Sequence, residues 1–260
     1  MPSLLKEEAV ISPYIARTRE ELGQVAANDV ASELRDRLAR QPGVRIIFAA
    51  APSQSAMLDA LTQAPGIDWQ RVTAFHMDEY LGLSPDAPQR FSAFLRHAIF
   101  DRLPFVAVHL INPTGNVQET VNIYAAELAK APIDIVLCGI GANGHLAFND
   151  PPAHFEDPLA VKQVQLDLTC RQQQVDDLCF DRLEDVPTEA ITLTIPRLLA
   201  SERVFCCVPG ALKSDAVRCS LEEPISENCP ASILRLHPAY KLYLDIDSAA
   251  KLKHNRPTLP

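Results

Sequence analysis

Residues 134–152 read Asp-Ile-Val-Leu-Cys-Gly-Ile-Gly-Ala-Asn-Gly-His-Leu-Ala-Phe-Asn-Asp-Pro-Pro, an apolar run that passes directly into a glycine-rich turn. Within eight residues the turn carries an amide (Asn143), an imidazole (His145) and a carboxylate (Asp150). Short apolar runs bounded by glycine are typical of parallel strands that are buried on both faces. The stretch therefore predicts a buried strand followed by an active-site loop.

The same apolar pattern recurs along the chain, each time beside a segment with helical spacing. A capping box at residues 18–21 opens a helix whose apolar positions continue to Leu38, before Pro42-Gly43 ends it. The predicted strands are 44–50, 72–77, 106–110, 133–138, 203–208 and 241–246, and the helices between them are 52–61, 90–100, 117–130 and 212–221. This alternation predicts an α/β fold with a doubly wound, mostly parallel, Rossmann-like sheet and helices on both faces.

The second half of the chain is less regular. Residues 161–168 are predicted to be extended, residues 171–174 form a polar stretch, and residues 191–195 alternate like a strand that Pro196 limits. Because no linker or internal repeat interrupts the chain, we expect residues 1–260 to form a single domain. Residues 251–260 are polar and are predicted to be a loosely held tail.

The composition narrows the class of partner. The net charge is -9, with 47% hydrophobic and 22% charged residues, which favours a globular protein without a nucleic-acid partner and leaves a phosphorylated small molecule open. The first eight residues place acids where a secretory signal would continue, and no stretch approaches the roughly 20 apolar residues of a membrane span. We therefore expect a cytoplasmic protein with no membrane partner.

The cysteines show no metal-binding pattern. Seven are present, an odd number, and most lie in apolar runs without Cys-x-x-Cys spacing. We expect reduced, buried thiols and no metal. Glycines 139, 141 and 144 let the backbone approach a ligand closely, but their spacing is not a dinucleotide fingerprint, so no nicotinamide cofactor is expected.

Polar residues follow two predicted strands at the edge where ligands bind in parallel sheets. Asp78 comes directly after strand 72–77, where a carboxylate can abstract a carbon-bound proton next to a carbonyl; capping a helix is its alternative role. Asn143 and Asp150 flank His145 and can fix its tautomer and orientation, which would make it a directed acid-base group.

Two segments resemble the signatures of the glucosamine-6-phosphate deaminase/isomerase family. Residues 75–80, Phe-His-Met-Asp-Glu-Tyr, resemble Phe-x-Met-Asp-Glu-Tyr, and residues 139–151 resemble Gly-x-Gly-x-(Asp or Asn)-Gly-His-x-x-Phe-Asn-Glu-Pro. Further weak matches extend the resemblance over most of the chain. It implies a metal-free, cofactor-free enzyme acting on an amino-sugar 6-phosphate, with Asp78 as the enolising base and with Asn143, His145 and Asp150 opening the sugar ring.

The chain departs from the family pattern at three positions of the histidine loop. Asn143 stands where many members carry Asp, which removes an ionisable group and keeps a hydrogen-bonding partner. Asp150 replaces the usual Glu and shortens the reach of the carboxylate by one methylene, and Pro152 is also unusual. These departures predict an altered charge balance around His145 and an altered rate or substrate choice.

The phosphate end of the substrate is predicted from three segments. Residues 51–55, Ala-Pro-Ser-Gln-Ser, replace the family's glycine-containing loop, and Ser53, Gln54 and Ser55 lie at a helix start that suits either an anion or an ordinary serine cap. The resemblance implies that Arg171 and Lys213 bind the phosphate.

Some family members are hexamers regulated between subunits through serines, an arginine and a lysine. At the corresponding positions this chain has Ala153, His154, Ala160 and Lys162, so only the lysine is kept. We therefore expect that regulation to be absent, while a homo-oligomer stays open.

The predicted reaction converts glucosamine 6-phosphate to fructose 6-phosphate and ammonia. Galactosamine-6-phosphate isomerisation and 6-phosphogluconolactone hydrolysis are the alternatives, and a lactonase would not need the proton abstraction assigned to Asp78. A non-catalytic sugar-phosphate sensor is the third hypothesis. It is disfavoured because the residues before Val44 offer one long helix and no basic recognition surface.

Overall fold

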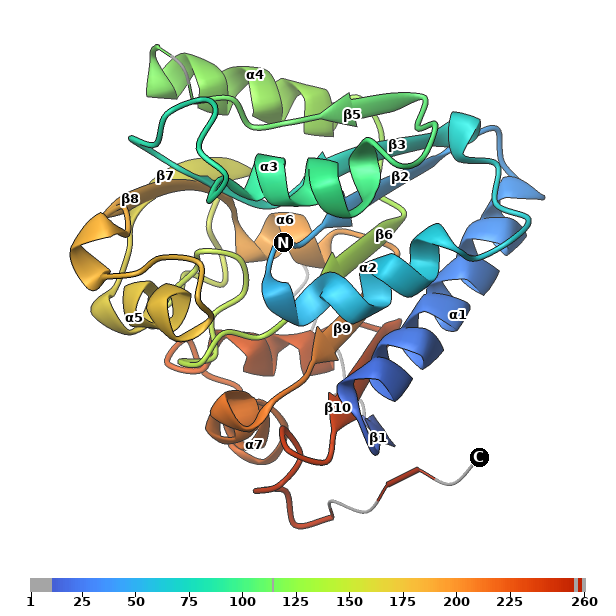
Figure 1. Ribbon diagram of the computed structural model, residues 1–260, viewed down its shortest axis with the longest axis vertical. Helices are drawn as coiled ribbons and strands as arrows, with labels where there is room; N and C mark the ends of the chain where they lie inside the picture. The colour runs from blue at the N-terminus through green and yellow to red at the C-terminus, as the bar shows by residue number, and fades with distance from the viewer. Residues whose placement is uncertain (1–10, 114, 255–256, 259–260) are drawn as a thin grey trace.

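A parallel sheet of seven strands organises the chain in the computed structural model, which describes residues 11–113, 115–254 and 257–258 (Figure 1). The strand order is β1-β10-β9-β6-β2-β3-β5, and every neighbouring pair is parallel. The strands are β1 (Tyr14–Ala16), β2 (Val44–Phe48), β3 (Val72–His76), β5 (Ala107–His109), β6 (Ile135–Cys138), β9 (Arg203–Val208) and β10 (Tyr240–Asp245). The predicted doubly wound α/β fold is confirmed.

The helices alternate with these strands. They are α1 (Arg19–Leu38), α2 (Ser55–Thr62), α3 (Phe91–Leu95), α4 (Val117–Ala129), α5 (Leu168–Asp176), α6 (Ile195–Leu199) and α7 (Ser214–Glu222). Helix α1 begins as its capping box predicts, because the Thr18 side chain accepts a hydrogen bond of 3.1 Å from the Glu21 backbone N–H. The predicted helix 90–100 is α3 followed by a π-helical turn, Arg96–Phe100.

The winding of the sheet reverses beside β2. From β2 the chain proceeds outward through β3 to β5, then returns to the other side of β2 and continues outward through β6, β9 and β10. In open parallel sheets a crevice forms beyond the carboxyl ends of the strands at such a reversal. The topology therefore places a binding crevice after β2 and β6.

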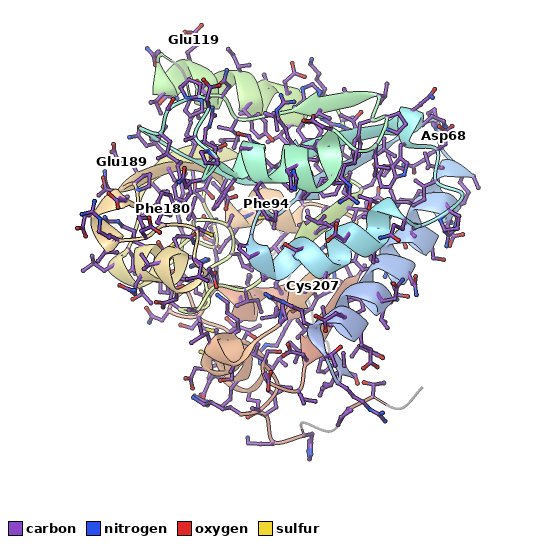
Figure 2. All side chains as sticks on the ribbon, viewed as in Figure 1. Asp68, Phe94, Glu119, Phe180, Glu189 and Cys207 are labelled. Carbon is purple, nitrogen blue, oxygen red and sulfur yellow. The ribbon has the colours of Figure 1, made fainter. Side chains whose placement is uncertain are left out.

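The core has two layers, one on each face of the sheet. Ile46 and Phe48 of β2 belong to a cluster with buried residues of α1 and α2, while Ile47 between them belongs to a second cluster with residues of α4, α6 and α7. Successive side chains of a strand point to opposite faces, so this apolar run satisfies both layers. Side chains fill the space between the ribbons (Figure 2).

A second, antiparallel sheet was not predicted from the sequence. It joins β4 (Asp78–Tyr80), β8 (Glu189–Leu193) and β7 (Val161–Gln165) in the order β4-β8-β7. The predicted extended segment 161–168 ends early, and the polar stretch 171–174 belongs to helix α5. Asp167 caps that helix by accepting from the Cys170 N–H at 3.0 Å, which a search for capping residues would have found.

The described part of the C-terminal tail is held, contrary to the prediction of a loose tail. The Thr258 backbone N–H donates to the Ile15 carbonyl at 2.8 Å, and its hydroxyl accepts from the Ile15 N–H at 2.9 Å. Because β1 is an edge strand, Ile15 otherwise has both backbone groups free on its outer side. Thr258 therefore covers part of that edge.

Two predictions about membranes and signals rest on different parts of the chain. Within residues 11–113, 115–254 and 257–258, no helix combines the length and the apolar character needed to cross a membrane. The segment on which the absence of a secretory signal was argued, residues 1–8, lies outside the described residues.

Candidate active site

The segments that follow β2, β3, β6 and β9 converge on one crevice, as the parallel-sheet rule predicts. Residues from each of them line it together with side chains of α3, the histidine loop and α5. The lining residues are Ala49, Ala50, Ala51, Ser53, Gln54, Met77, Asp78, Phe91, Gly139, Ile140, Gly141, His145, Ala147, Phe148, Gln173, Gln174 and Lys213. Asp78, His145, Ser53, Gln54 and Lys213 were all predicted from the sequence.

Asp78 presents a buried carboxyl group to the crevice. Its residue is 6% exposed, and its Oδ1 atom has no hydrogen-bond partner among the described residues. Burial first, and then the charge of Glu79, raise the pKa of Asp78 well above its usual value. The backbone is fixed because Asp78 pairs with Thr192 across β4 and β8. The group is therefore a rigidly held and unusually basic carboxylate.

Glu79 has a different role from its neighbour. It is fully buried and accepts hydrogen bonds from the backbone N–H groups of Tyr80, Phe91 and Ser92 at 2.9–3.0 Å. The Nε atom of the Arg90 guanidinium lies 3.4 Å from Glu79 Oε2. Glu79 thus ties the start of α3 to β4, and the helix-capping role that was the alternative for Asp78 belongs to Glu79.

Asn143, His145 and Asp150 form one connected group in the histidine loop. His145 Nδ1 lies 3.2 Å from Asp150 Oδ1, and the Asn143 amide donates to the same oxygen at 3.0 Å. Asn143 also accepts from the His145 backbone N–H at 3.1 Å. Burial disfavours the Asp150 carboxylate, but its contacts with His145 and Asn143 prevail and lower the pKa of Asp150. The carboxylate therefore orients the imidazole through Nδ1.

The glycines of the loop have specific steric roles. A Cβ atom at Gly141 would lie 2.2 Å from Cε1 and Nε2 of the His145 ring, so no other residue lets the imidazole reach its place. Gly144 has a φ of +86°, a backbone conformation that residues other than glycine rarely adopt. Gly141 is therefore required by the position of the imidazole, and Gly144 by the backbone conformation of the turn.

The predicted phosphate residues are only partly brought together. Ser53 and Gln54 line the crevice, and the Gln54 amide is held by the Cys207 carbonyl at 3.1 Å. Lys213 lies 5% exposed, and its Nζ atom has no hydrogen-bond partner among the described residues. Burial lowers the pKa of Lys213. Ser55, the first residue of α2, does not line the crevice.

Arg171 lies outside the crevice, contrary to its predicted place. Its guanidinium donates to the backbone carbonyls of Leu183 at 2.7 Å and Val186 at 2.9 Å. Gln173 and Gln174 of the same helix line the crevice instead, and Gln173, two residues along the helix, is rotated by about 200° from Arg171. The polar stretch of α5 therefore contributes amides rather than a guanidinium.

Apolar side chains that the sequence did not single out close the crevice. The rings of Phe91 and Phe148 stack with centroids 5.4 Å apart, and both line it together with Met77 and Ile140. They line the same crevice as the Asp78 carboxyl, whose burial is the main cause of its raised pKa.

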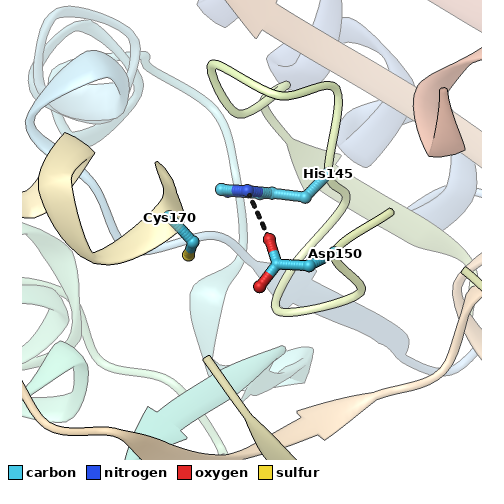
Figure 3. A group of neighbouring side chains, drawn as sticks. All are labelled: His145, Asp150 and Cys170. Atoms are coloured by element: carbon cyan, nitrogen blue, oxygen red, sulfur yellow. Dashed lines mark ion pairs between the residues drawn. The ribbon is translucent and has the colours of Figure 1, made fainter. Parts of the chain in front are cut away.

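Cys170 joins the histidine group from the first turn of α5. Its sulfur, an Asp150 oxygen and a His145 ring nitrogen all lie within 4.8 Å of one another (Figure 3). Burial first, and then the charge of Asp150, raise the pKa of the Cys170 thiol. Like the other described thiols it is unpaired, and five of the seven are buried and two half-buried.

One of the positions that serve regulation in some family members can be described by its contacts. Lys162, the one residue of that set that this chain keeps, forms an ion pair of 2.8 Å with Asp157. Its charge is therefore already neutralised within the chain.

Comparison with known proteins agrees with this geometry. A family model described as Glucosamine-6-phosphate isomerases/6-phosphogluconolactonase matches residues 17–242. A glucosamine-6-phosphate deaminase of Exiguobacterium sibiricum is 37% identical over 187 residues, 72% of this chain and 73% of that protein. One of Streptococcus sanguinis is 30% identical over 232 residues, 89% of this chain and 97% of that protein.

Solved structures give the same grouping. A monomeric glucosamine-6-phosphate deaminase superposes with a TM-score of 0.85 at 28% identity, covering 92% of this chain and 99% of that one. A 6-phosphogluconolactonase from Thermotoga maritima superposes with a TM-score of 0.73 at 15% identity, covering 90% and 99%, which shows a shared fold. With the family model spanning most of the sequence, the chain belongs to the glucosamine-6-phosphate isomerase/6-phosphogluconolactonase family of enzymes.

Proposed function

We propose that this protein is an isomerase and deaminase that converts an amino-sugar 6-phosphate, glucosamine 6-phosphate in the simplest case, to a ketose 6-phosphate and ammonia. The observation that carries the proposal is that the Asp78 carboxyl and the His145 imidazole open onto one crevice. A basic carboxylate and an oriented imidazole can carry the proton transfers of an acid-base aldose–ketose conversion. The names of the similar curated proteins support the choice of substrate.

His145 opens the pyranose ring in this proposal. Asp150 holds Nδ1 at 3.2 Å, which leaves Nε2 to exchange a proton with the substrate. The imidazole takes the proton of the anomeric hydroxyl and returns a proton to the ring oxygen as the carbon–oxygen bond breaks. Asp150 stabilises the imidazolium that forms in between.

Asp78 then moves hydrogen between two carbons. In its ionised form it takes the proton from C2, which gives an enolamine, and it delivers the proton to C1, which leaves an imine at C2. Water adds to that imine and ammonia departs, so the atoms balance as amino sugar plus water to ketose plus ammonia. Burial raises the pKa of Asp78 and therefore makes its carboxylate a stronger base than an exposed aspartate.

Lys213 is the proposed phosphate anchor. Its buried ammonium has no hydrogen-bond partner among the described residues, so an incoming phosphate dianion would supply the missing counter-charge. Ser53 lies in the same crevice and adds a hydroxyl donor, while the Gln54 amide, which donates to the Ser53 hydroxyl and the Cys207 carbonyl, holds this loop in place. Binding energy from this end of the substrate holds the reacting carbons in position.

One assay distinguishes this proposal from galactosamine-6-phosphate isomerisation, from 6-phosphogluconolactone hydrolysis and from a non-catalytic sensor. Purified protein would be mixed with the 6-phosphates of glucosamine, galactosamine and mannosamine, and ammonia release measured, with 6-phosphogluconolactone hydrolysis as a parallel arm. We expect ammonia from glucosamine 6-phosphate and no lactone hydrolysis above background. Lactone hydrolysis without ammonia would replace the proposal by a lactonase, and binding without turnover would replace it by a sensor.

A cytoplasmic location stays a prediction from the sequence, and a homo-oligomer stays open. Among solved structures, the deaminase with a TM-score of 0.85 is a monomer, so the fold does not require subunit contacts.

A further inference from the structure

Three potential metal ligands come together beside the proposed catalytic imidazole. His145 and Asp150 belong to the histidine loop, and Cys170 enters from α5 (Figure 3). The nitrogen, oxygen and sulfur atoms that they offer lie within 4.8 Å of one another, and the residues are buried or nearly so. No step of the reaction proposed above uses the Cys170 thiol.

The distances between the three ligand atoms suit a cation with tetrahedral coordination. Ligand nitrogen and oxygen atoms about 2.0–2.1 Å from zinc, at a tetrahedral angle, lie about 3.3 Å apart. His145 Nδ1 and Asp150 Oδ1 lie 3.2 Å apart before any metal binds. A zinc-bound sulfur lies about 3.6 Å from such ligands, so the group has to contract by no more than about 1.2 Å at its widest separation.

The donor set selects the class of cation. An imidazole, a carboxylate and a thiolate match zinc and the softer cadmium, whereas magnesium and calcium take oxygen ligands. Three protein ligands also leave a fourth position for water, as in open zinc sites.

Solvent reaches the group from two sides. His145 lines the catalytic crevice, and Asp150 lines a second hollow together with Asp167 and Lys162. A cation therefore has a path to Asp150 that does not cross the substrate position.

We propose that His145, Asp150 and Cys170 form an inhibitory site for a borderline-soft divalent cation, Zn²⁺ or Cd²⁺. On binding, the Cys170 S–H bond breaks, its proton passes to solvent, and a metal–sulfur bond forms. The cation takes the place of the proton on His145 Nδ1, and that proton moves by way of solvent to Nε2. A neutral ring protonated at Nε2 cannot accept a proton from the substrate. The inhibitory effect rests on the proposed function, whereas the binding site does not.

The direct test is cadmium binding to the whole protein without substrate. Thiolate coordination to Cd²⁺ produces an ultraviolet charge-transfer absorption, which would be followed during titration of the wild type and Cys170→Ser. Cys219→Ser is the control, because Cys219 and Cys229 are neighbouring thiols that could give a similar absorption elsewhere. Replacing a residue that merely supports a metal ligand typically weakens binding 10- to 100-fold, so we expect at least about a tenfold weaker affinity on loss of the sulfur itself.

We expect the wild type to develop a charge-transfer absorption on addition of Cd²⁺. Cys170→Ser should lose the part of this absorption that comes from the site at Cys170, and Cys219→Ser should keep that part. An absorption unchanged in Cys170→Ser would overturn the proposal.

A second experiment measures inhibition by Zn²⁺, with the rate of each protein expressed relative to its own rate without metal. We expect a rise of about tenfold or more in the inhibitory concentration for Cys170→Ser, and equal inhibition of both proteins would overturn the inhibitory role. Cadmium binding by a protein that releases no ammonia would keep the site and reject the proposed function instead.

Discussion

The backbone of Gly141 and the imidazole of His145 occupy adjoining space so tightly that a Cβ atom at residue 141 would lie 2.2 Å from two ring atoms. This contact fixes one side of the ring, and Asp150 fixes the other through Nδ1. The position of the proposed acid-base group therefore depends on residue 141 being a glycine, which has no side chain.

Gly141→Ala should displace the imidazole and lower kcat by about a hundredfold or more, since small misplacements of catalytic groups have effects of this size. Steady-state ammonia release would measure it, with circular dichroism to confirm folding. Gly82→Asn is the control, because a Cβ at Gly82 meets no atom within 4 Å and asparagine tolerates its positive φ. A folded Gly141→Ala protein with wild-type kcat would contradict the assigned role of the ring.

Glu79→Gln should lower stability rather than remove chemistry. The amide cannot accept all the backbone hydrogen bonds that the buried carboxylate receives, and each unsatisfied buried group costs about 1–3 kcal/mol. Denaturant unfolding would measure the loss in the free energy of unfolding, with the exposed Glu156→Gln as the matched control. An unchanged unfolding midpoint would show that Glu79 does not hold α3 in place.

Asp78→Asn should have the opposite effect on stability. Because burial raises the pKa of Asp78, its ionisation at neutral pH destabilises the folded protein. Replacing it by a neutral amide should raise the free energy of unfolding at pH 7, and the gain should vanish as pH falls below the ordinary pKa of 3.8. Unfolding curves between pH 3 and 8, referenced to the exposed Asp86→Asn, would test this, and a gain independent of pH would contradict it.

Lys213→Met and Arg171→Ala should separate phosphate binding from structure. Losing a charge-assisted contact worth about 1.5–3 kcal/mol should raise KM about 10- to 150-fold for Lys213→Met. Arg171→Ala should leave KM near the wild-type value and lower the thermal midpoint instead, since its guanidinium binds the carbonyls of Leu183 and Val186. A KM increase confined to Arg171→Ala would reverse the two assignments.

The parallel sheet and the crevice could be predicted because each rests on a local pattern. Apolar runs define buried strands, and the carboxyl ends of parallel strands meet at one edge, so Asp78, His145 and Lys213 could be placed together. The resemblance added roles that spacing alone does not give. The single-domain organisation stays a prediction, as do the assigned roles themselves.

The features of the fold and the site that could not be predicted depend on contacts between distant segments. The β4-β8-β7 sheet was missed because its three short strands come from separate parts of the chain. Arg171 was misplaced because the helical rotation of α5, which points Gln173 and Gln174 into the crevice, was not recognised in a polar sequence. Cys170 was counted as an ordinary buried thiol, and only the fold brings it to Asp150.

The most direct measurement of the central claim is deuterium transfer in heavy water. Wild-type protein should place solvent deuterium at C1 of the ketose product, because the proton that Asp78 takes from C2 exchanges with the solvent before the carboxyl delivers it to C1. Asp78→Asn should bind substrate about as well but show no incorporation, with kcat lowered by about 10²- to 10⁴-fold. Undiminished incorporation and turnover in Asp78→Asn would contradict the assignment of Asp78 as the base.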